Sequence, residues 1–172
     1  MKFMLRALAV SLILFGCTAQ EASDSQYREQ PEETEVRSEM SAPEEERSGV
    51  IAVEATTNNA NGYTFSVTIK SPDTGCDQYA NWWEVITEDG NLLYRRILAH
   101  SHVEEQPFTR SGGPVEIEPD EVVIVRSHMY PTGYQSQAMQ GSFSNGFETT
   151  TLPTDFAIEL TETEPLPTDC NF

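Results

Sequence analysis

Residues 49–172 predict an all-β fold, an antiparallel β-sandwich of about seven or eight strands. From Tyr63 to Lys70, apolar and polar residues alternate, which is the period-two pattern of a strand with one buried face. Clusters of Gly, Asn, Asp, Ser and Pro separate several similar runs and supply turn residues. After residue 16, no stretch of ten or more residues has the apolar stripe of a helix.

The individual strands follow from short apolar runs bounded by turn residues. They are expected at Val50–Ala55, Tyr63–Lys70, Trp82–Thr87, Leu92–His100, Val115–Ile117, Val122–His128, Ala138–Phe143 and Phe156–Leu160. Chain reversals are expected at Asn58–Gly62, Glu88–Asn91, Ser111–Pro114 and Ser144–Gly146. The strand count and the Trp pair early in the third strand resemble immunoglobulin-like or fibronectin-type domains, without the usual cysteine pair between the sheets. A jelly roll or small barrel is the alternative.

The start of the chain has the anatomy of a targeting segment, with Lys2 and Arg6 followed by an apolar run from Ala7 to Phe15. The sequence Leu14-Phe15-Gly16-Cys17 resembles the bacterial lipobox. That resemblance implies a lipoprotein signal peptide over residues 1–16, cleavage before Cys17, and attachment of acyl chains such as palmitate to Cys17. The alternatives are an ordinary secretory signal or a cytosolic helix.

Residues 17–48 are expected to form a disordered acidic linker after the lipidated cysteine. They contain ten acidic residues and three arginines, a net charge of −7, and almost no large apolar groups. A binding arm that folds on a basic partner is the alternative. Thr18 and Ala19 do not resemble the Asp-type signal for inner-membrane retention, so a cell-envelope location at the outer rather than the inner membrane is expected.

The charge of the chain excludes several classes of partner. Asp and Glu number 28 against 10 Lys and Arg, a formal net charge of −18, so nucleic acid would be repelled. The sequence contains no run of 18 apolar residues, which is about the length that a membrane-spanning helix needs. Residues 49–172 alone hold 18 acidic and 5 basic residues, a net charge of −13. A membrane surface would repel such a body, so lipid is expected to hold it there.

With Cys17 committed to lipid, Cys76 and Cys170 are left to form one disulfide, which an oxidising, exported compartment would preserve. The bond would attach the C-terminal end of the chain to the body of the domain. Two unpaired thiols, with Cys76 as a nucleophile or ligand, are the alternative.

The three histidines suggest a transition-metal site as a second hypothesis. His100 and His102 would share a strand face, and His128 or Glu105 could complete a Zn or Cu site. The stretch from His100 to Glu105, with Gly112 beyond it, resembles part of the cupin metal motif, which would make His100, His102 and Glu105 the ligands. Ordinary packing is the favoured reading, so no cofactor is expected.

Aromatic residues mark the expected contact surface. Trp82 and Trp83 would face opposite sides of their strand, one in the core and the other toward water or the disulfide. Tyr130 and Tyr134 flank a loop that could contact an envelope protein or a glycan.

Charged residues in the strands have a structural interpretation. Arg95 or Arg96 is expected to form an ion pair with Glu84 across a hairpin. Known catalytic motifs are absent from the sequence. A non-catalytic binding or structural domain is therefore expected rather than an enzyme.

Overall fold

The computed structural model describes residues 48–58 and 62–171. The predicted signal peptide, Cys17 and all of the predicted linker except Ser48 lie outside the described residues. Within the described part of the chain, no helix is long and apolar enough to cross a membrane.

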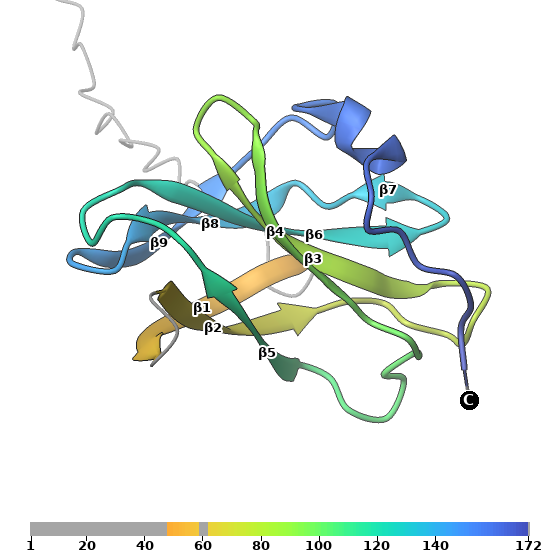
Figure 1. Ribbon diagram of the computed structural model, residues 1–172. Helices are drawn as coiled ribbons and strands as arrows, with labels where there is room; N and C mark the ends of the chain where they lie inside the picture. Colours follow the sequence, from red (N-terminus) through yellow and green to blue (C-terminus); the bar gives the residue numbers. More distant parts are fainter. Residues whose placement is uncertain (1–47, 59–61, 172) are drawn as a thin grey trace, which may run out of the picture. The chain divides into compact units, whose positions relative to one another are not determined.

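The described residues form an all-β domain (Figure 1). Its strands are β1 (Gly49–Asn58), β2 (Gly62–Lys70), β3 (Tyr79–Thr87), β4 (Leu92–Ile97), β5 (Phe108–Val115), β6 (Val123–Tyr130), β7 (Gly133–Tyr134), β8 (Gln137–Ser142) and β9 (Gly146–Thr151). One 3-10 helix, η2 (Ile158–Glu162), follows the last strand. The β class expected from the alternating pattern is confirmed.

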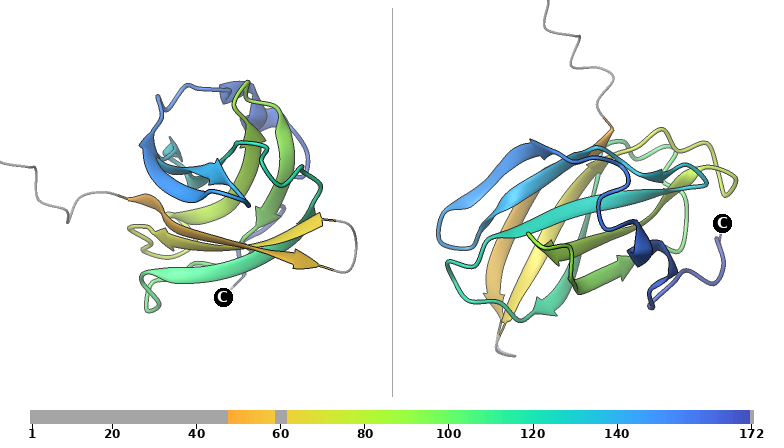
Figure 2. Two further views of the ribbon diagram at one scale, coloured as in Figure 1. Left: turned by 90° about the vertical axis from the view of Figure 1, so that its left-hand side faces the viewer. Right: turned by 90° about the horizontal axis from the view of Figure 1, so that it is seen from above.

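The strands follow the order β4-β3-β6-β8-β1-β2-β5, with β7 added to β6 and β9 added to β8. The sheet folds over so that β1, β2 and β5 face the layer built from the other strands, in a nearly closed, barrel-like sandwich (Figure 2). Sequence neighbours pair as hairpins at β1/β2, β3/β4 and β8/β9, because tight turns favour antiparallel pairs.

The expectation of a purely antiparallel sheet is wrong at one junction. β1 and β8 pair in parallel where Gly49 lies opposite Gln137. Gly49 has a φ of +142°, and a Cβ built there would lie 2.3 Å from the carbonyl oxygen of Gln137. Only glycine allows this backbone approach, which joins the two layers of the sandwich.

The main core lies between the two layers. The alternation predicted in β2 is present, since Tyr63, Phe65, Val67 and Ile69 are all buried. They pack in one cluster with Trp83 of the facing layer.

A second apolar cluster covers the outer face of β3 and β6. It contains Trp82, Ile86, Ile124, Tyr134, Ala138 and Leu160. The expectation that one tryptophan of the pair meets water or the disulfide is therefore wrong, because Trp82 is 3% exposed and Trp83 is 0% exposed. β3 is buried on both faces because the chain after β9 returns over its outer side.

The glycine-rich stretch Ser111–Pro114 is a strand and not the expected reversal, and the strand expected at Val115–Ile117 is replaced by β5. A Cβ on Gly112 would lie 2.6 Å from the hydroxyl of Tyr94 and 3.0 Å from Trp83. The glycine is needed for packing beneath these rings and not for a turn.

The structure differs from expectation in three further places. The strand expected at Phe156–Leu160 is replaced by turns and by η2. β4 ends at Ile97, short of His100, and β9 was not expected. Phe156 and Leu160 pack on Trp82 and its neighbours, so their apolar character serves a covering segment and not a strand.

Candidate functional site

A pocket opens where β3 and β6 meet the C-terminal segment. Its volume is about 340 Å³. The residues that line it are Cys76, Tyr79, Asn81, Tyr130, Pro167, Thr168, Asp169 and Cys170. They come from three parts of the sequence, and the fold brings them together at one end of the sandwich.

The disulfide predicted between Cys76 and Cys170 is confirmed, and it forms one wall of this pocket. It joins Cα atoms 5.6 Å apart that are separated by 94 positions in sequence. Next to it, the Asn171 amide donates a hydrogen bond to the Ala99 carbonyl at 2.7 Å. The pocket wall from Pro167 to Cys170 is therefore attached to the body of the domain at its far end.

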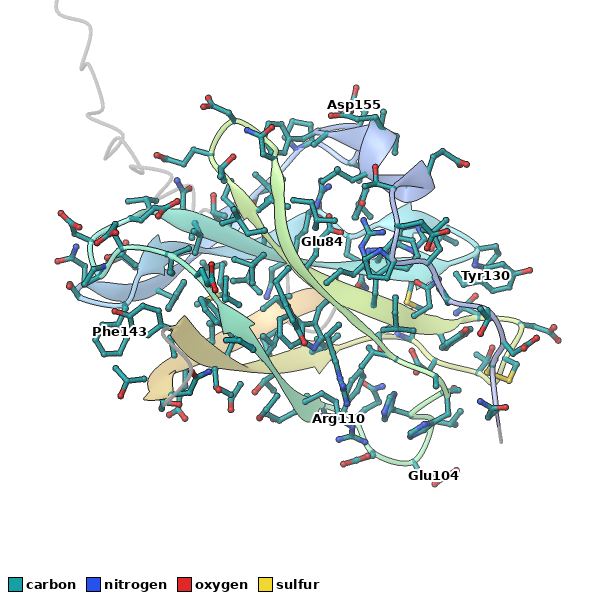
Figure 3. The ribbon with its side chains drawn as sticks, viewed as in Figure 1. Glu84, Glu104, Arg110, Tyr130, Phe143 and Asp155 are labelled. Atoms are coloured by element: carbon teal, nitrogen blue, oxygen red, sulfur yellow. A yellow bond between two sulfur atoms is a disulfide. The ribbon has the colours of Figure 1, made fainter. Side chains whose placement is uncertain are left out.

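Two tyrosines form the aromatic part of the pocket. Tyr79 of β3 and Tyr130 of β6 are register partners, with ring centroids 6.2 Å apart and ring planes at 56°. Tyr79 is 4% exposed, whereas Tyr130 is 49% exposed. Burial, followed by the nearby Tyr130, Asp169 and Asp73, raises the pKa of Tyr79, so its hydroxyl stays protonated near neutral pH. Figure 3 shows Tyr130 at the opposite end of the domain from Phe143.

A stacked pair lies behind the pocket. His128 stacks on Trp82, with ring centroids 3.7 Å apart and planes at 7°. His128 Nδ1 lies 2.7 Å from Asn81 Oδ1, which assigns the donor to this ring nitrogen because an amide oxygen only accepts. Burial, followed by the charges of Arg95 and Arg126, lowers the pKa of His128 to about 4. The neutral imidazole fixes the position of Asn81.

Of the predicted contact residues, Tyr130 is exposed to solvent and Tyr134 and Trp82 are buried. Tyr134 packs edge-on against Trp82 and under the guanidinium of Arg126, 3.5 Å from its ring centroid. Burial, followed by the nearby Glu84, raises the pKa of Tyr134 to about 12. Tyr134 and Trp82 therefore support the outer face of the sheet and do not line the pocket.

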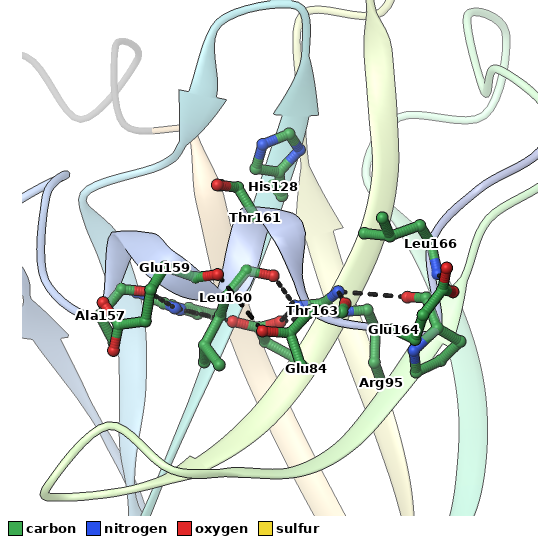
Figure 4. A network of polar contacts seen from close by, with 12 residues as sticks. Glu84, Arg95, His128, Ala157, Glu159, Leu160, Thr161, Thr163, Glu164 and Leu166 are labelled. Atoms are coloured by element: carbon green, nitrogen blue, oxygen red, sulfur yellow. Dashed lines mark hydrogen bonds and ion pairs between the residues drawn. The ribbon is translucent and has the colours of Figure 1, made fainter.

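A buried Arg–Glu–Arg cluster lies beneath the C-terminal segment (Figure 4). Glu84 Oε2 accepts a hydrogen bond from Arg95 Nε at 2.8 Å, which confirms the expected ion pair. Glu84 Oε1 accepts a second bond, from Arg126 Nε, at 2.8 Å. Sequence reasoning missed Arg126, although its position as a lone charge within an apolar run was a usable signal.

The two arginines also hold the C-terminal segment through its backbone carbonyls. Arg95 donates to Leu160 at 2.7 Å, to Thr163 at 2.5 Å and to Pro165 at 3.1 Å. Arg126 donates to the carbonyl oxygens of Phe156 and Ala157. The segment that ends in the pocket wall is thus held by the cluster along its length and by the disulfide at its end.

The histidines proposed as metal ligands separate into two environments. The rings of His100 and His102 are 4.6 Å apart, so the expected juxtaposition exists, although on a loop beyond β4. His102 is buried and stacks on Phe108, with ring centroids 3.8 Å apart. Burial, followed by the charge of Arg110, lowers the pKa of His102.

The other proposed ligands do not complete this pair. Glu105 is held by Arg110, with Oε2 2.7 Å from Nη2, and His128 stacks on Trp82. Across residues 48–58 and 62–171, no three His, Cys, Asp or Glu side chains converge as a metal site requires. Metal binding at these histidines stays a prediction.

Comparison with known proteins gives one relative. A protein of Halomicrobium mukohataei named "Putative lipoprotein" is 44% identical over 89 residues, which is 51% of this chain and 44% of the relative. The chain therefore spans less than half the length of that relative. Because only 48 residues precede β1, a match of this length extends into the β domain. No protein-family model and no solved structure match the chain.

Proposed function

We propose that this protein is a cell-envelope lipoprotein, anchored by acyl chains on Cys17, that presents a non-catalytic β-sandwich to a binding partner. The name of the relative, "Putative lipoprotein", carries the proposal, because it agrees with the lipoprotein signal that the motif from Leu14 to Cys17 implies. The outer-membrane location stays a prediction from Thr18 and Ala19.

The anchor must be lipid because electrostatics act against attachment. Removal of residues 1–16 deletes Lys2 and Arg6, which leaves 28 acidic and 8 basic residues and a net charge of −20. An anionic membrane surface repels that charge. Two or more acyl chains give stable attachment, at about 0.8 kcal/mol for each buried methylene group.

The arrangement of strands supports assignment of the domain to the immunoglobulin-like class. β1, β2 and β5 form one layer, and β4, β3, β6 and β8 form the facing layer. The β1-β2-β5 layer facing the order β4-β3-β6-β8 resembles the two-sheet arrangement of immunoglobulin-like and fibronectin-type domains, with β7 and β9 as additions to the second layer. Such sandwiches commonly present loops and strand ends to partners.

The placement of the titratable groups supports a binding role without catalysis. Glu84 is neutralised by two arginines, and His128 is held between Trp82 and Asn81. Both groups are buried and have structural partners in the part of the sheet beside the pocket. The partner would be an envelope protein or a glycan that reaches the pocket beside Tyr130.

The lipid anchor is tested by Cys17→Ser in the full-length chain, followed by separation of membrane and soluble fractions. We expect the wild-type protein in the membrane fraction, extractable only with detergent, and the variant in the soluble fraction. Thr18→Ser changes the neighbouring residue and leaves the cysteine intact, so it should remain with the membrane. Retention of Cys17→Ser in the membrane fraction would contradict the proposal.

A further inference from the structure

We infer that the pocket between Tyr79, Tyr130 and Asp169 binds a cationic side chain, an arginine or lysine of a peptide segment of the partner. This inference rests on the proposed binding role of the domain and names the chemistry of what it binds. It does not depend on the lipid anchor.

Tyr130 supplies an exposed aromatic ring to the pocket, and the buried ring of Tyr79 lies beside it. The ring planes meet at 56° with centroids 6.2 Å apart, so the two rings are tilted and form a corner of the pocket lining and not a parallel stack. Tyr130 is half exposed and available, and Tyr79 is fixed by burial. A guanidinium or ammonium group is attracted to aromatic faces within about 6 Å of the ring centroid.

The charge around this corner is negative. Asp169 lines the pocket, Asp73 is buried outside the lining, and both carboxylates contribute to the raised pKa of Tyr79. None of the eight lining residues is Lys, Arg or His. A cationic ligand therefore meets the Asp169 carboxylate and the exposed ring of Tyr130, with no positively charged residue in the pocket lining.

Three of the five Lys and Arg residues of the domain have carboxylate partners away from the pocket. Arg95 and Arg126 are buried on Glu84, and Arg110 pairs with Glu105. An anionic ligand would have to enter a domain of net charge −13 and approach Asp169. A cation is favoured by both the local and the overall field.

The pocket is also preorganised. Asp169 precedes Cys170, whose disulfide fixes this part of the wall, and the backbone before it is held by Arg95. Asn81, at the back, has its amide oxygen committed to His128. Little conformational entropy is then lost when a ligand binds, which favours selective recognition by a small site.

The test is titration of the full-length protein, in detergent micelles at low ionic strength, with an end-capped Gly-Arg-Gly peptide followed by backbone amide NMR shifts. The matched probe replaces arginine with citrulline, which has the same shape and a neutral urea. We expect the citrulline peptide to bind about tenfold more weakly, with shifts from the arginine peptide centred on Tyr79, Tyr130 and Asp169.

Variants separate the pocket from general surface charge. Asp169→Asn and Tyr130→Leu should each weaken arginine-peptide binding about threefold to tenfold. Asp155→Asn removes the same charge from an exposed site far from Tyr130 in Figure 3, and it should change affinity less than about twofold. Tyr130 is 49% exposed and its ring contact is with Tyr79, so we expect Tyr130→Leu to keep the fold.

Three results would overturn the inference. They are equal affinity for the two peptides, an equal loss for Asp155→Asn and Asp169→Asn, or shifts at this pocket from a neutral disaccharide and not from the arginine peptide. The first two would indicate no charge recognition at the pocket, and the third would indicate a glycan site. If Cys17→Ser is released from the membrane and any of these three results is found, the proposed lipid anchor is supported and only the proposed cationic ligand is rejected.

Discussion

Glu84 of β3 lies opposite Arg126 of β6, with Glu84 Oε1 2.8 Å from Arg126 Nη2 and both side chains almost fully shielded from solvent. Arg95, from the strand on the other side of β3, contacts the second carboxylate oxygen. Both arginines use their remaining donors on backbone carbonyls of the C-terminal segment. Glu84 therefore neutralises and positions the two groups that hold this segment on the sheet.

Substitution of Glu84 should expose that dependence. Glu84→Gln keeps the shape of the side chain and leaves two buried guanidinium groups without a counterion, so we expect a loss of about 3–5 kcal/mol in the free energy of unfolding. Urea unfolding followed by tryptophan fluorescence measures it. Glu159→Gln, at an exposed carboxylate, is the control and should change stability by less than about 0.5 kcal/mol. Equal effects of the two variants would show that the cluster does not stabilise the fold.

Removal of the disulfide should lower stability by increasing the entropy of the unfolded chain. For a sequence separation of 94, the chain-entropy model gives about 4–5 kcal/mol. We expect the double variant Cys76→Ser/Cys170→Ser to melt at a lower temperature than the oxidised wild type. A reductant should lower the melting temperature of the wild type and leave the double variant unchanged. The same melting temperature with and without reductant in the wild type would contradict this assignment.

Several elements were predictable because their signals are local. Alternation in β2 predicts which side chains are buried, and the turn residues Glu88–Asn91 predict the β3/β4 hairpin. β5 was missed because the need for glycine at position 112 comes from the close approach of Tyr94 and Trp83, which are distant in sequence. No pattern within the segment from Ser111 to Pro114 distinguishes a glycine that lies under rings from a glycine that makes a turn.

The candidate site was predictable only in part. Tyr130 was expected to contact a partner from its place beside a loop, and the disulfide followed from the cysteine count. Tyr79 and Asp169 were missed because only the folded chain brings them together. Trp82 was expected to be accessible, and it is covered because the C-terminal segment folds back over β3.

Salt should stabilise this domain. It holds 18 acidic and 5 basic residues, and two of the five, Arg95 and Arg126, are buried. Two of the acidic residues, Glu84 and Asp73, are buried as well, so the remaining residues keep the net charge of −13. Screening of their self-repulsion favours the compact state. We expect the melting temperature to rise from low salt to about 1 M KCl, where the Debye length is about 3 Å. A melting temperature that falls or stays constant over this range would refute the prediction.

Acid should destabilise the domain through His128. Its pKa is about 4 in the folded state and 6.5 in the reference state, so the unfolded chain binds a proton that the folded chain does not. Stability is therefore lost as the pH falls from about 6.5 to about 4, by roughly 3 kcal/mol from this group. His102, whose pKa is also lowered, acts in the same direction.

The contribution of His128 is measured as a difference between variants. His128→Gln should reduce the loss of unfolding free energy between pH 7 and pH 4, because the titrating group is gone. His100→Gln removes an exposed histidine and should leave most of that loss in place. Identical pH profiles for wild type and His128→Gln would show that His128 titrates alike in both states.

The attachment of lipid to Cys17 is tested most directly by mass spectrometry of the N-terminal fragment from the mature, membrane-purified protein. We expect a fragment that begins at Cys17 and carries the mass of two or more acyl chains. An unmodified thiol at Cys17, or a mature chain that begins at any other residue, would contradict this expectation.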